Sequence, residues 1–194
     1  MKIIVTCSIS LDGVAQAPGR ADEDTRGGFE HGGWGVPYSD EVMGRAMGRR
    51  MAEGGSLLLG RRTYEALFAF WPKQTDGNPY TEVLNRRQKY VASRTLSTPL
   101  PWVNSTLLEG DAVAAVAAMH ERPGPNLGVI GSLDLVQQLA RHDLVDEYLL
   151  LIHPLILGRG LRLFADDGTF RALRLVDSET TTTGVVIATY RAAT

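Results

Sequence analysis

Residues 56–64 read SLLLGRRTY, a short apolar run that ends at Gly60 and continues into a polar, helix-like pattern. Such a run, closed by a glycine, is typical of a buried strand. Apolar side chains then recur at helical spacing over Arg61–Trp71, and Pro72 ends the helix. A strand that leads directly into a helix is part of a βαβ unit. This segment therefore predicts an α/β fold with parallel strands.

The same alternation extends in both directions from this segment. Further strands are predicted at Lys2–Ser8, Gln88–Ala92, Ser105–Leu108, Leu127–Ile130 and Glu147–Ile152. Other helices are predicted to begin after the N-caps Ser39, Asp111 and Ser132. Two late strands, Leu173–Glu179 and Gly184–Tyr190, flank a threonine-rich turn and predict an antiparallel hairpin. We expect one α/β domain over residues 1–194, with a mixed, mostly parallel sheet flanked by helices.

Composition excludes several classes of protein. The chain is 44% apolar and 22% charged, which is a globular balance, and its 21 glycines show no collagen period. The single cysteine, Cys7, cannot form an internal disulfide, and no apolar run approaches the roughly 18–20 residues that cross a bilayer. A net charge of −2 argues against nucleic-acid binding. The histidines show no metal-site spacing. We expect a cytoplasmic protein without a metal that binds neither nucleic acid nor membrane.

Three predicted strands end in residues that suit phosphate binding. At residues 60–63, a glycine permits close approach, a new helix offers unpaired N–H groups, and two guanidinium groups can reach an anion. Ser93 and Arg94 suit a phosphomonoester such as the 2′-phosphate of NADPH, and Gly131 and Ser132 open another helix. Each junction alone is equally consistent with an ordinary polar strand end. Three at equivalent ends of one sheet favour an extended dinucleotide over a single phosphate.

Several motifs resemble those of a known superfamily. The segments SLDG at 10–13, LGRRTYE at 59–65 and VIGS at 129–132 occur in the order seen in the dihydrofolate reductase-like superfamily. The segments LVDE at 144–147 and LGRG at 157–160 are similar to those of the reductase domain of the riboflavin-biosynthesis deaminase/reductase. The resemblance covers essentially the whole chain. It implies an eight- or nine-stranded mixed sheet and NADPH as the hydride donor.

Carried onto this sequence, the resemblance places cofactor contacts at the three junctions and beside the first turn. It assigns phosphate contacts to Gly60, Arg61 and Thr63, and the guanidinium of Arg62 is a further candidate. The 2′-phosphate would contact Ser93 and Arg94, and the pyrophosphate and nicotinamide would contact Gly131, Ser132 and Leu133. The nicotinamide ring would lie against Ser8, Val14 and Ala15.

The substrate side is less well defined. Dihydrofolate reductases hold the pterin with a carboxylate on the first helix, but Gly44 stands at that position here, and Asp40 lies one turn earlier. Asp40, Tyr64 or an ordered water are the candidate proton donors. Asp40 equally suits a dipole partner in the first turn of a helix. Trp34 and Phe164 are candidate pocket walls, and the glycine-rich residues 27–35 are a candidate lid or a surface loop.

Together these features predict an NADPH-dependent reductase that resembles the ribosylaminouracil-phosphate reductase or dihydrofolate reductase. The substrate would be a small, flat heterocycle of the pterin, pyrimidine or flavin-precursor kind. The alternative is a non-catalytic nucleotide-binding or sensor protein that keeps the cofactor clamp. As in similar proteins, residues 147–152 and the loop through Phe164 are expected to contribute to a homodimer interface.

Overall fold

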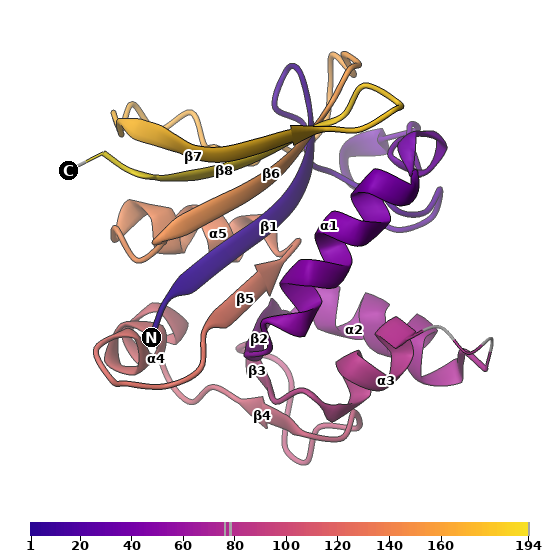
Figure 1. The fold of residues 1–194 in the computed structure, drawn as a ribbon. Coiled ribbons are helices and arrows are strands. Elements are labelled where there is room, and N and C mark those ends of the chain that lie inside the picture. Colours follow the sequence, from indigo (N-terminus) through magenta and orange to yellow (C-terminus); the bar gives the residue numbers. More distant parts are fainter. Residues whose placement is uncertain (76, 78, 194) are drawn as a thin grey trace.

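The computed structural model describes residues 1–75, 77 and 79–193, and within them eight strands form one sheet (Figure 1). The strand order is β4-β3-β2-β5-β1-β6-β8-β7. The strands are β1 (Ile3–Ser10), β2 (Ser56–Gly60), β3 (Lys89–Ala92), β4 (Ser105–Leu107), β5 (Leu127–Ile130), β6 (Glu147–His153), β7 (Leu173–Thr180) and β8 (Val186–Ala192). Neighbours from β4 to β6 are parallel, whereas β8 is antiparallel to both β6 and β7. The predicted mixed sheet with a C-terminal hairpin is confirmed.

In the described part of the chain, five α-helices connect the strands. They are α1 (Glu41–Ala52), α2 (Arg61–Phe70), α3 (Pro79–Arg86), α4 (Ala112–His120) and α5 (Leu133–Arg141). The predicted N-cap of α1 was one residue off, because Asp40 rather than Ser39 accepts the hydrogen bond from the Met43 N–H. Helix α3 was not predicted. Its last carbonyls are bonded by the buried ammonium of Lys89, which donates to Leu84, Asn85 and Arg87.

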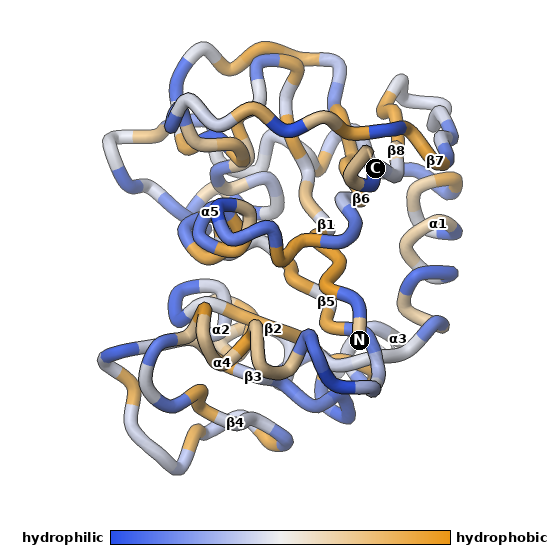
Figure 2. Tube along the Cα trace, turned by 90° about the vertical axis from the view of Figure 1, so that its left-hand side faces the viewer, coloured by the Kyte–Doolittle hydropathy of each residue, from blue (hydrophilic) through white to orange (hydrophobic). Residues whose placement is uncertain are grey.

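Apolar side chains fill both faces of the sheet. Leu57 and Leu59 of β2 pack with Tyr64 of α2, while Leu58 between them belongs to the core beneath α4 and α5. This alternation places the apolar run of β2 in contact with helices on both sides, as parallel strands require. Figure 2 shows the same arrangement: hydrophobic strands lie in the interior, and the helices around them are partly hydrophilic.

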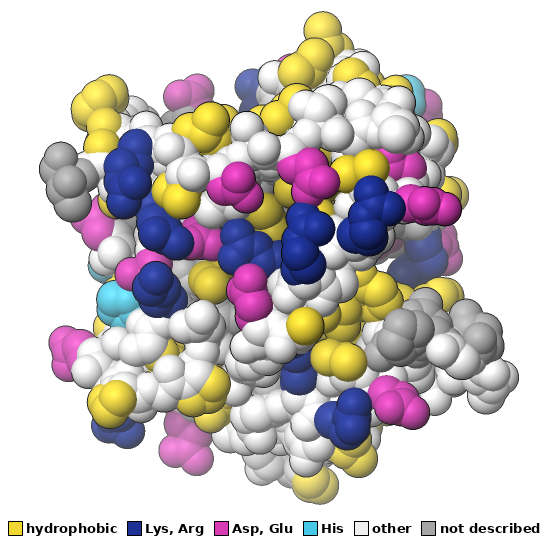
Figure 3. Space-filling view, viewed as in Figure 1, with side chains coloured by type: hydrophobic (Ala, Val, Ile, Leu, Met, Phe, Trp, Pro, Cys, Tyr) yellow, Lys and Arg dark blue, Asp and Glu magenta, His cyan; other side chains and the backbone are white. Residues whose placement is uncertain are grey.

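Helix α1 covers β6 and β8 and is tied to the sheet by charge as well as packing. Its Ala46 lies in a buried cluster with Leu149 and Leu151, and Arg50 reaches the buried carboxylate of Glu147 at 3.1 Å. Acidic and basic side chains are interleaved on this face of the molecule (Figure 3). Within residues 1–75, 77 and 79–193, no helix is both long enough and apolar enough to cross a membrane.

The strand expected at a dimer interface lies inside the sheet. Strand β6 is an inner strand, since β1 pairs with one of its edges and β8 with the other. Nearly all of its residues are buried within the chain, and its expected contribution to a dimer interface stays a prediction. The outer strand of this half of the sheet is β7, which is exposed along almost its whole length.

Candidate functional site

The three strand ends predicted to bind phosphate lie side by side at the carboxyl-terminal end of the parallel strands, which we call the carboxyl edge of the sheet. Strands β3, β2 and β5 are adjacent and parallel, so their carboxyl ends share that edge. Gly60, the last residue of β2, is in register with Ala92, the last residue of β3. Ligands of open α/β sheets bind at this edge.

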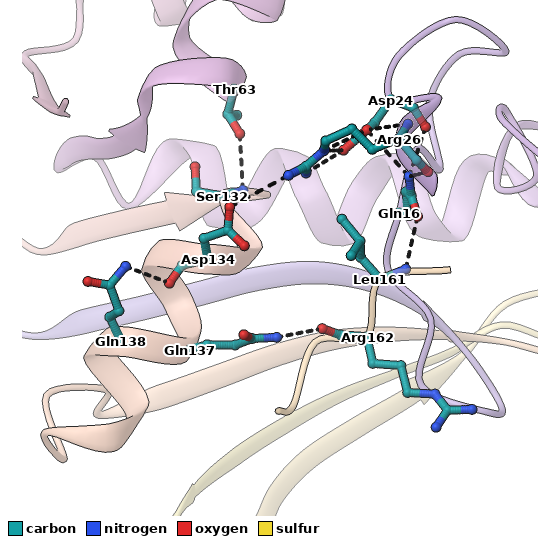
Figure 4. Close-up of polar contacts among 10 residues, drawn as sticks. All are labelled: Gln16, Asp24, Arg26, Thr63, Ser132, Asp134, Gln137, Gln138, Leu161 and Arg162. Carbon is teal, nitrogen blue, oxygen red and sulfur yellow. Dashed lines mark hydrogen bonds and ion pairs between the residues drawn. The ribbon is translucent and has the colours of Figure 1, made fainter. Parts of the chain in front are cut away.

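Two of these junctions are joined by direct hydrogen bonds. The Gly60 N–H donates to Ser132 Oγ at 2.9 Å. The Ser132 N–H donates to Thr63 Oγ1 at 3.0 Å, as Figure 4 shows. Gly131 and Ser132 both have a φ of 55°. A Cβ at Gly131 would lie 3.3 Å from Thr63 Oγ1, so this position favours glycine for its contacts as well as its backbone. The starts of α2 and α5 are therefore held close together.

The helices that start at this edge lack side-chain caps. Asp40 and Asp111 cap α1 and α4, whereas among the described residues no side chain caps the first turn of α2 or α5. Ser132 is the N-cap residue of α5, as predicted, but its hydroxyl does not bond the first turn; it accepts from the Gly60 N–H and donates to the Ile130 carbonyl. In α5 the Leu135 N–H donates to the Ser132 carbonyl, so the N–H groups at residues 133 and 134 are the first-turn donors that remain for an anion. With the first turn of α2, this donor set fits the phosphates of a dinucleotide.

Arginine side chains flank these helix starts. The Arg61 guanidinium lies 3.3 Å from the Glu65 carboxylate one turn later. Arg62 and Arg94 are exposed, and in the described part of the chain neither side chain has a hydrogen bond or an ion pair. The Ser93 hydroxyl accepts from the N–H groups at residues 95 and 96, which closes the turn that carries Arg94. Arg62 and Arg94 are thus the guanidinium groups available for a phosphate.

The residues expected beside the nicotinamide lie in β1 and the loop that follows it. Ser8 is partly buried and pairs with Leu151 in the sheet. Val14 and Ala15 are buried, and the Ala15 N–H donates to the Leu161 carbonyl at 2.8 Å. The first loop is therefore bonded to the loop between β6 and β7. Leu133 packs against the main core at the start of α5. The cofactor roles of these four residues stay predictions.

A cavity of about 340 Å³ lies between these two loops. Its lining residues are Gln16, Arg26, Gly27, Phe29, Arg159, Gly160 and Leu161. Gln16 is buried and bonds both loops. Its Nε2 donates to the carbonyls of Asp24 and Arg26, and its Oε1 accepts from the Leu161 N–H (Figure 4). Because every polar atom of this side chain is bonded, the cavity wall is held in one arrangement.

Both candidate proton donors are engaged in structural hydrogen bonds. Asp40 accepts from the Met43 N–H and also from the N–H and hydroxyl of Thr182, and these bonds lower the pKa of its carboxyl group. Asp40 is therefore ionised near neutral pH. The Tyr64 side chain is buried, and its hydroxyl accepts from the Trp102 N–H at 3.0 Å. The Tyr64 hydroxyl keeps its proton, but the side chain is buried beside Trp102, and the catalytic roles of Asp40 and Tyr64 stay predictions.

Trp34 and Phe164 lie in different parts of the molecule. Trp34 belongs to a buried cluster with Phe29, and its indole N–H donates to the Gln16 carbonyl at 2.7 Å. Phe164 is half-exposed and packs edge-on against Tyr148. The candidate lid is anchored through Phe29 and Trp34. The structure brings neither aromatic ring into the cavity wall, and their pocket roles stay predictions.

Sequence reasoning did not identify four polar residues that organise these loops, namely Asp12, Gln16, Arg26 and Asp134. Asp12 lies in a quoted motif, but its partners are the N–H groups at residues 157 and 158. Those contacts span more than 140 positions in the chain. No local pattern predicts such a pairing.

With this geometry established, comparison with known proteins identifies the family. The model of the RibD C-terminal domain matches residues 1–187. The chain belongs to the RibD C-terminal domain family. Membership of this family supports a reductase-type function.

Individual relatives agree with this assignment. YyaP of Bacillus subtilis is 30% identical over 141 residues, which cover 70% of this chain and 72% of YyaP. YwjB of the same organism is 26% identical over 179 residues, or 90% of this chain and 88% of YwjB. Both are described as uncharacterized proteins.

Two solved structures share the fold of this RibD C-terminal domain protein. A putative riboflavin biosynthesis protein from Shewanella sp. PV-4 aligns over 100% of both chains with a TM-score of 0.69 and 22% identity. A pyrimidine reductase-like protein from Corynebacterium diphtheriae aligns over 100% of this chain and 92% of its own, with a TM-score of 0.67 and 13% identity.

Proposed function

We propose that this protein is an NADPH-dependent reductase that acts on a small, flat heterocycle. The observation that carries the proposal is the pair of uncapped helix starts, α2 and α5, braced together at the carboxyl edge of the sheet. Two helix N-termini at one edge suit the pyrophosphate of a dinucleotide better than a single phosphate. Family membership supports the same cofactor, since reductases of this family generally use NADPH.

The residues around the junctions would divide the work of holding the cofactor. First-turn N–H groups of α2 and α5 would bind the pyrophosphate, and Arg94 would bind the 2′-phosphate beside the end of β3. Bound NADPH supplies a hydride to the substrate. The protein contributes placement and exclusion of water, which the closely bonded loops around Gln16 support. Because Asp40 is ionised near neutral pH and Tyr64 is buried, we propose a single ordered water as the proton donor.

A cofactor titration tests this proposal. We expect micromolar binding of NADPH and binding of NADH about 10- to 100-fold weaker, because a hydrogen bond to a charged group contributes roughly 1.5–3 kcal/mol. Arg94→Ala should remove this preference. Arg174→Ala, which changes an exposed arginine on the distant strand β7, should leave both affinities unchanged. Equal affinity of the wild-type protein for both cofactors would refute the assignment of Arg94.

An oxidation assay separates the enzyme from a cofactor-binding protein without catalysis. NADPH oxidation is followed at saturating cofactor with dihydrofolate and with pyrimidine and flavin-precursor heterocycles. Turnover of one of them supports the reductase. Tight NADPH binding with no oxidation by any of them favours the non-catalytic sensor.

A further inference from the structure

Arg26, in the loop that follows β1, contacts two carboxylates, one of which lies at the start of α5. Arg26 pairs with Asp24 through two nitrogens, with the shortest contact at 2.6 Å, and its third nitrogen lies 3.6 Å from Asp134 Oδ2 (Figure 4). Asp134 is in the first turn of α5, two residues after Ser132. This trio, Asp24, Arg26 and Asp134, joins the cavity wall to the helix start expected to bind the pyrophosphate.

Asp134 creates an electrostatic conflict at that helix start. A carboxylate in the first turn interacts favourably with the helix dipole when no other anion is present. The same negative charge opposes any phosphate that binds to the N–H groups of this turn. The Arg26 guanidinium is the cation that lies nearest this exposed carboxylate, and, although it also pairs with Asp24, it offsets part of the opposition.

We propose that Arg26 is a positioning residue for cofactor binding that acts through Asp134, by offsetting part of its charge at the start of α5. The inference rests on the proposed function for its ligand, a dinucleotide pyrophosphate. Arg26 need not touch the ligand in this account. Its contribution depends on the presence of the Asp134 carboxylate, and this dependence separates the proposal from direct phosphate binding.

The loop can tolerate the loss of this guanidinium. Gln16 holds the turn through the backbone carbonyls of Asp24 and Arg26, and Arg159 donates to the Gly27 carbonyl at 2.8 Å. None of these bonds uses the Arg26 side chain. An Arg26→Ala variant therefore keeps the anchors of the turn, which makes it suitable for a binding experiment.

A double-mutant cycle on NADPH affinity tests the proposal. We expect Arg26→Ala to weaken binding about fivefold and Asp134→Asn to tighten it about twofold, the range expected for a charge near a helix end. In the Asp134→Asn background, Arg26→Ala should weaken NADPH binding by less than about twofold, because the negative charge that Arg26 offsets is absent. A full fivefold loss in that background would overturn the proposal in favour of direct contact.

Two further variants separate charge from structure. Arg26→Lys keeps the charge but not the paired contact with Asp24, so it should bind within about twofold of wild type. A loss equal to that of Arg26→Ala would show a structural role and overturn the proposal. Arg20→Ala, in the same loop and paired with the exposed Asp22, is the matched control and should have no effect.

Calorimetry with inorganic pyrophosphate repeats the cycle without NADPH. We expect affinity to rise from Arg26→Ala to wild type to Asp134→Asn. This order in a protein that does not bind NADPH would support the inference while refuting the proposed cofactor. Equal pyrophosphate affinity, or no binding, in all three proteins would overturn the inference whatever the outcome with NADPH.

Discussion

Ser132 joins the two halves of the candidate site through one hydroxyl and one backbone N–H. Its Oγ accepts from the Gly60 N–H, and its own N–H donates to Thr63 Oγ1. It holds this position in the left-handed region, with φ 55° and ψ 46°, which disfavours a side chain. Strain of this kind persists where the surrounding contacts compensate for it, and it is frequent at binding sites.

Substitutions at Ser132 separate the hydrogen bonds from the backbone strain. We expect Ser132→Ala to lower the free energy of unfolding by about 1–2 kcal/mol, because the Gly60 N–H loses its acceptor. Ser132→Gly removes the same hydroxyl but adopts a positive φ without strain, so it should be more stable than the alanine variant by about 1 kcal/mol. Urea denaturation measures both values. An alanine variant as stable as wild type would contradict the bracing role.

At the scale of elements, the first loop and the loop between β6 and β7 form one bonded unit. The Asp12 carboxylate accepts from the N–H groups of Leu157 and Gly158 and from the Ser10 hydroxyl at 2.6 Å. These bonds, the Ser10 hydroxyl first, lower the pKa of Asp12 from 3.8 to about 2. The ionised carboxylate therefore stabilises the folded arrangement of the two loops.

The sign of the resulting pH dependence follows from the lowered pKa of Asp12. The contribution is present above the unfolded pKa, near pH 4, and is lost as the pH falls towards 2. We expect Asp12→Asn to flatten the acid-induced decrease in the free energy of unfolding over this interval. Asp22→Asn, at an exposed carboxylate that pairs with Arg20, should follow the wild-type curve. Parallel curves for wild type and Asp12→Asn would contradict the role of Asp12.

Helix α3 depends on a residue outside it. Lys89 is fully buried at the start of β3, donates to three carbonyls at the end of the helix, and lies 4.5 Å from the Trp102 ring centre. Lys89→Met should lower the free energy of unfolding by about 1–3 kcal/mol, because buried carbonyls lose their donor. Hydrogen exchange should accelerate first in α3. Lys2→Met, at an exposed lysine, is the control, and equal effects of the two substitutions would refute this account.

At the scale of the whole molecule, the exposed strand β7 is the surface on which we expect association with another chain. Leu173, Leu175 and Val176 on this strand are between 36% and 54% exposed. Among the described strands β7 pairs with β8 alone, so its outer edge is a template for association. We propose a second copy of this chain as the partner, in keeping with the homodimer expected from similar proteins. The interface is then formed by β7.

Light scattering tests this arrangement. We expect a mass of two chains for the wild-type protein and of one chain for Leu175→Glu, because a buried charge at the interface is unfavourable. Leu11→Glu replaces another exposed leucine, in the first loop, and should remain dimeric. A wild-type mass equal to one chain would eliminate the homodimer.

Local patterns in the sequence determined most of the sheet. All eight strands were predicted to within about two residues, since each is a short apolar run bounded by turn residues. The junctions at Gly60, Arg94 and Gly131 were also predicted, because a glycine or arginine at a strand end is itself a local signal. Helix α3 was not predicted, because Lys89, whose ammonium bonds the carbonyls at its C-terminal end, lies outside the helix.

Only the tertiary structure decided how these pieces meet. The order β3-β2-β5 places the three junctions together, and the hydrogen bonds of Ser132 to Gly60 and Thr63 join segments about 70 residues apart. The same is true of Asp12, Gln16 and the Arg26–Asp134 pair, whose partners are distant in sequence. A residue's own neighbours set its propensity, whereas such contacts depend on the packing of the whole chain. The sequence by itself therefore determined where a cofactor could bind, and the packing of the chain decided which side chains hold that edge together.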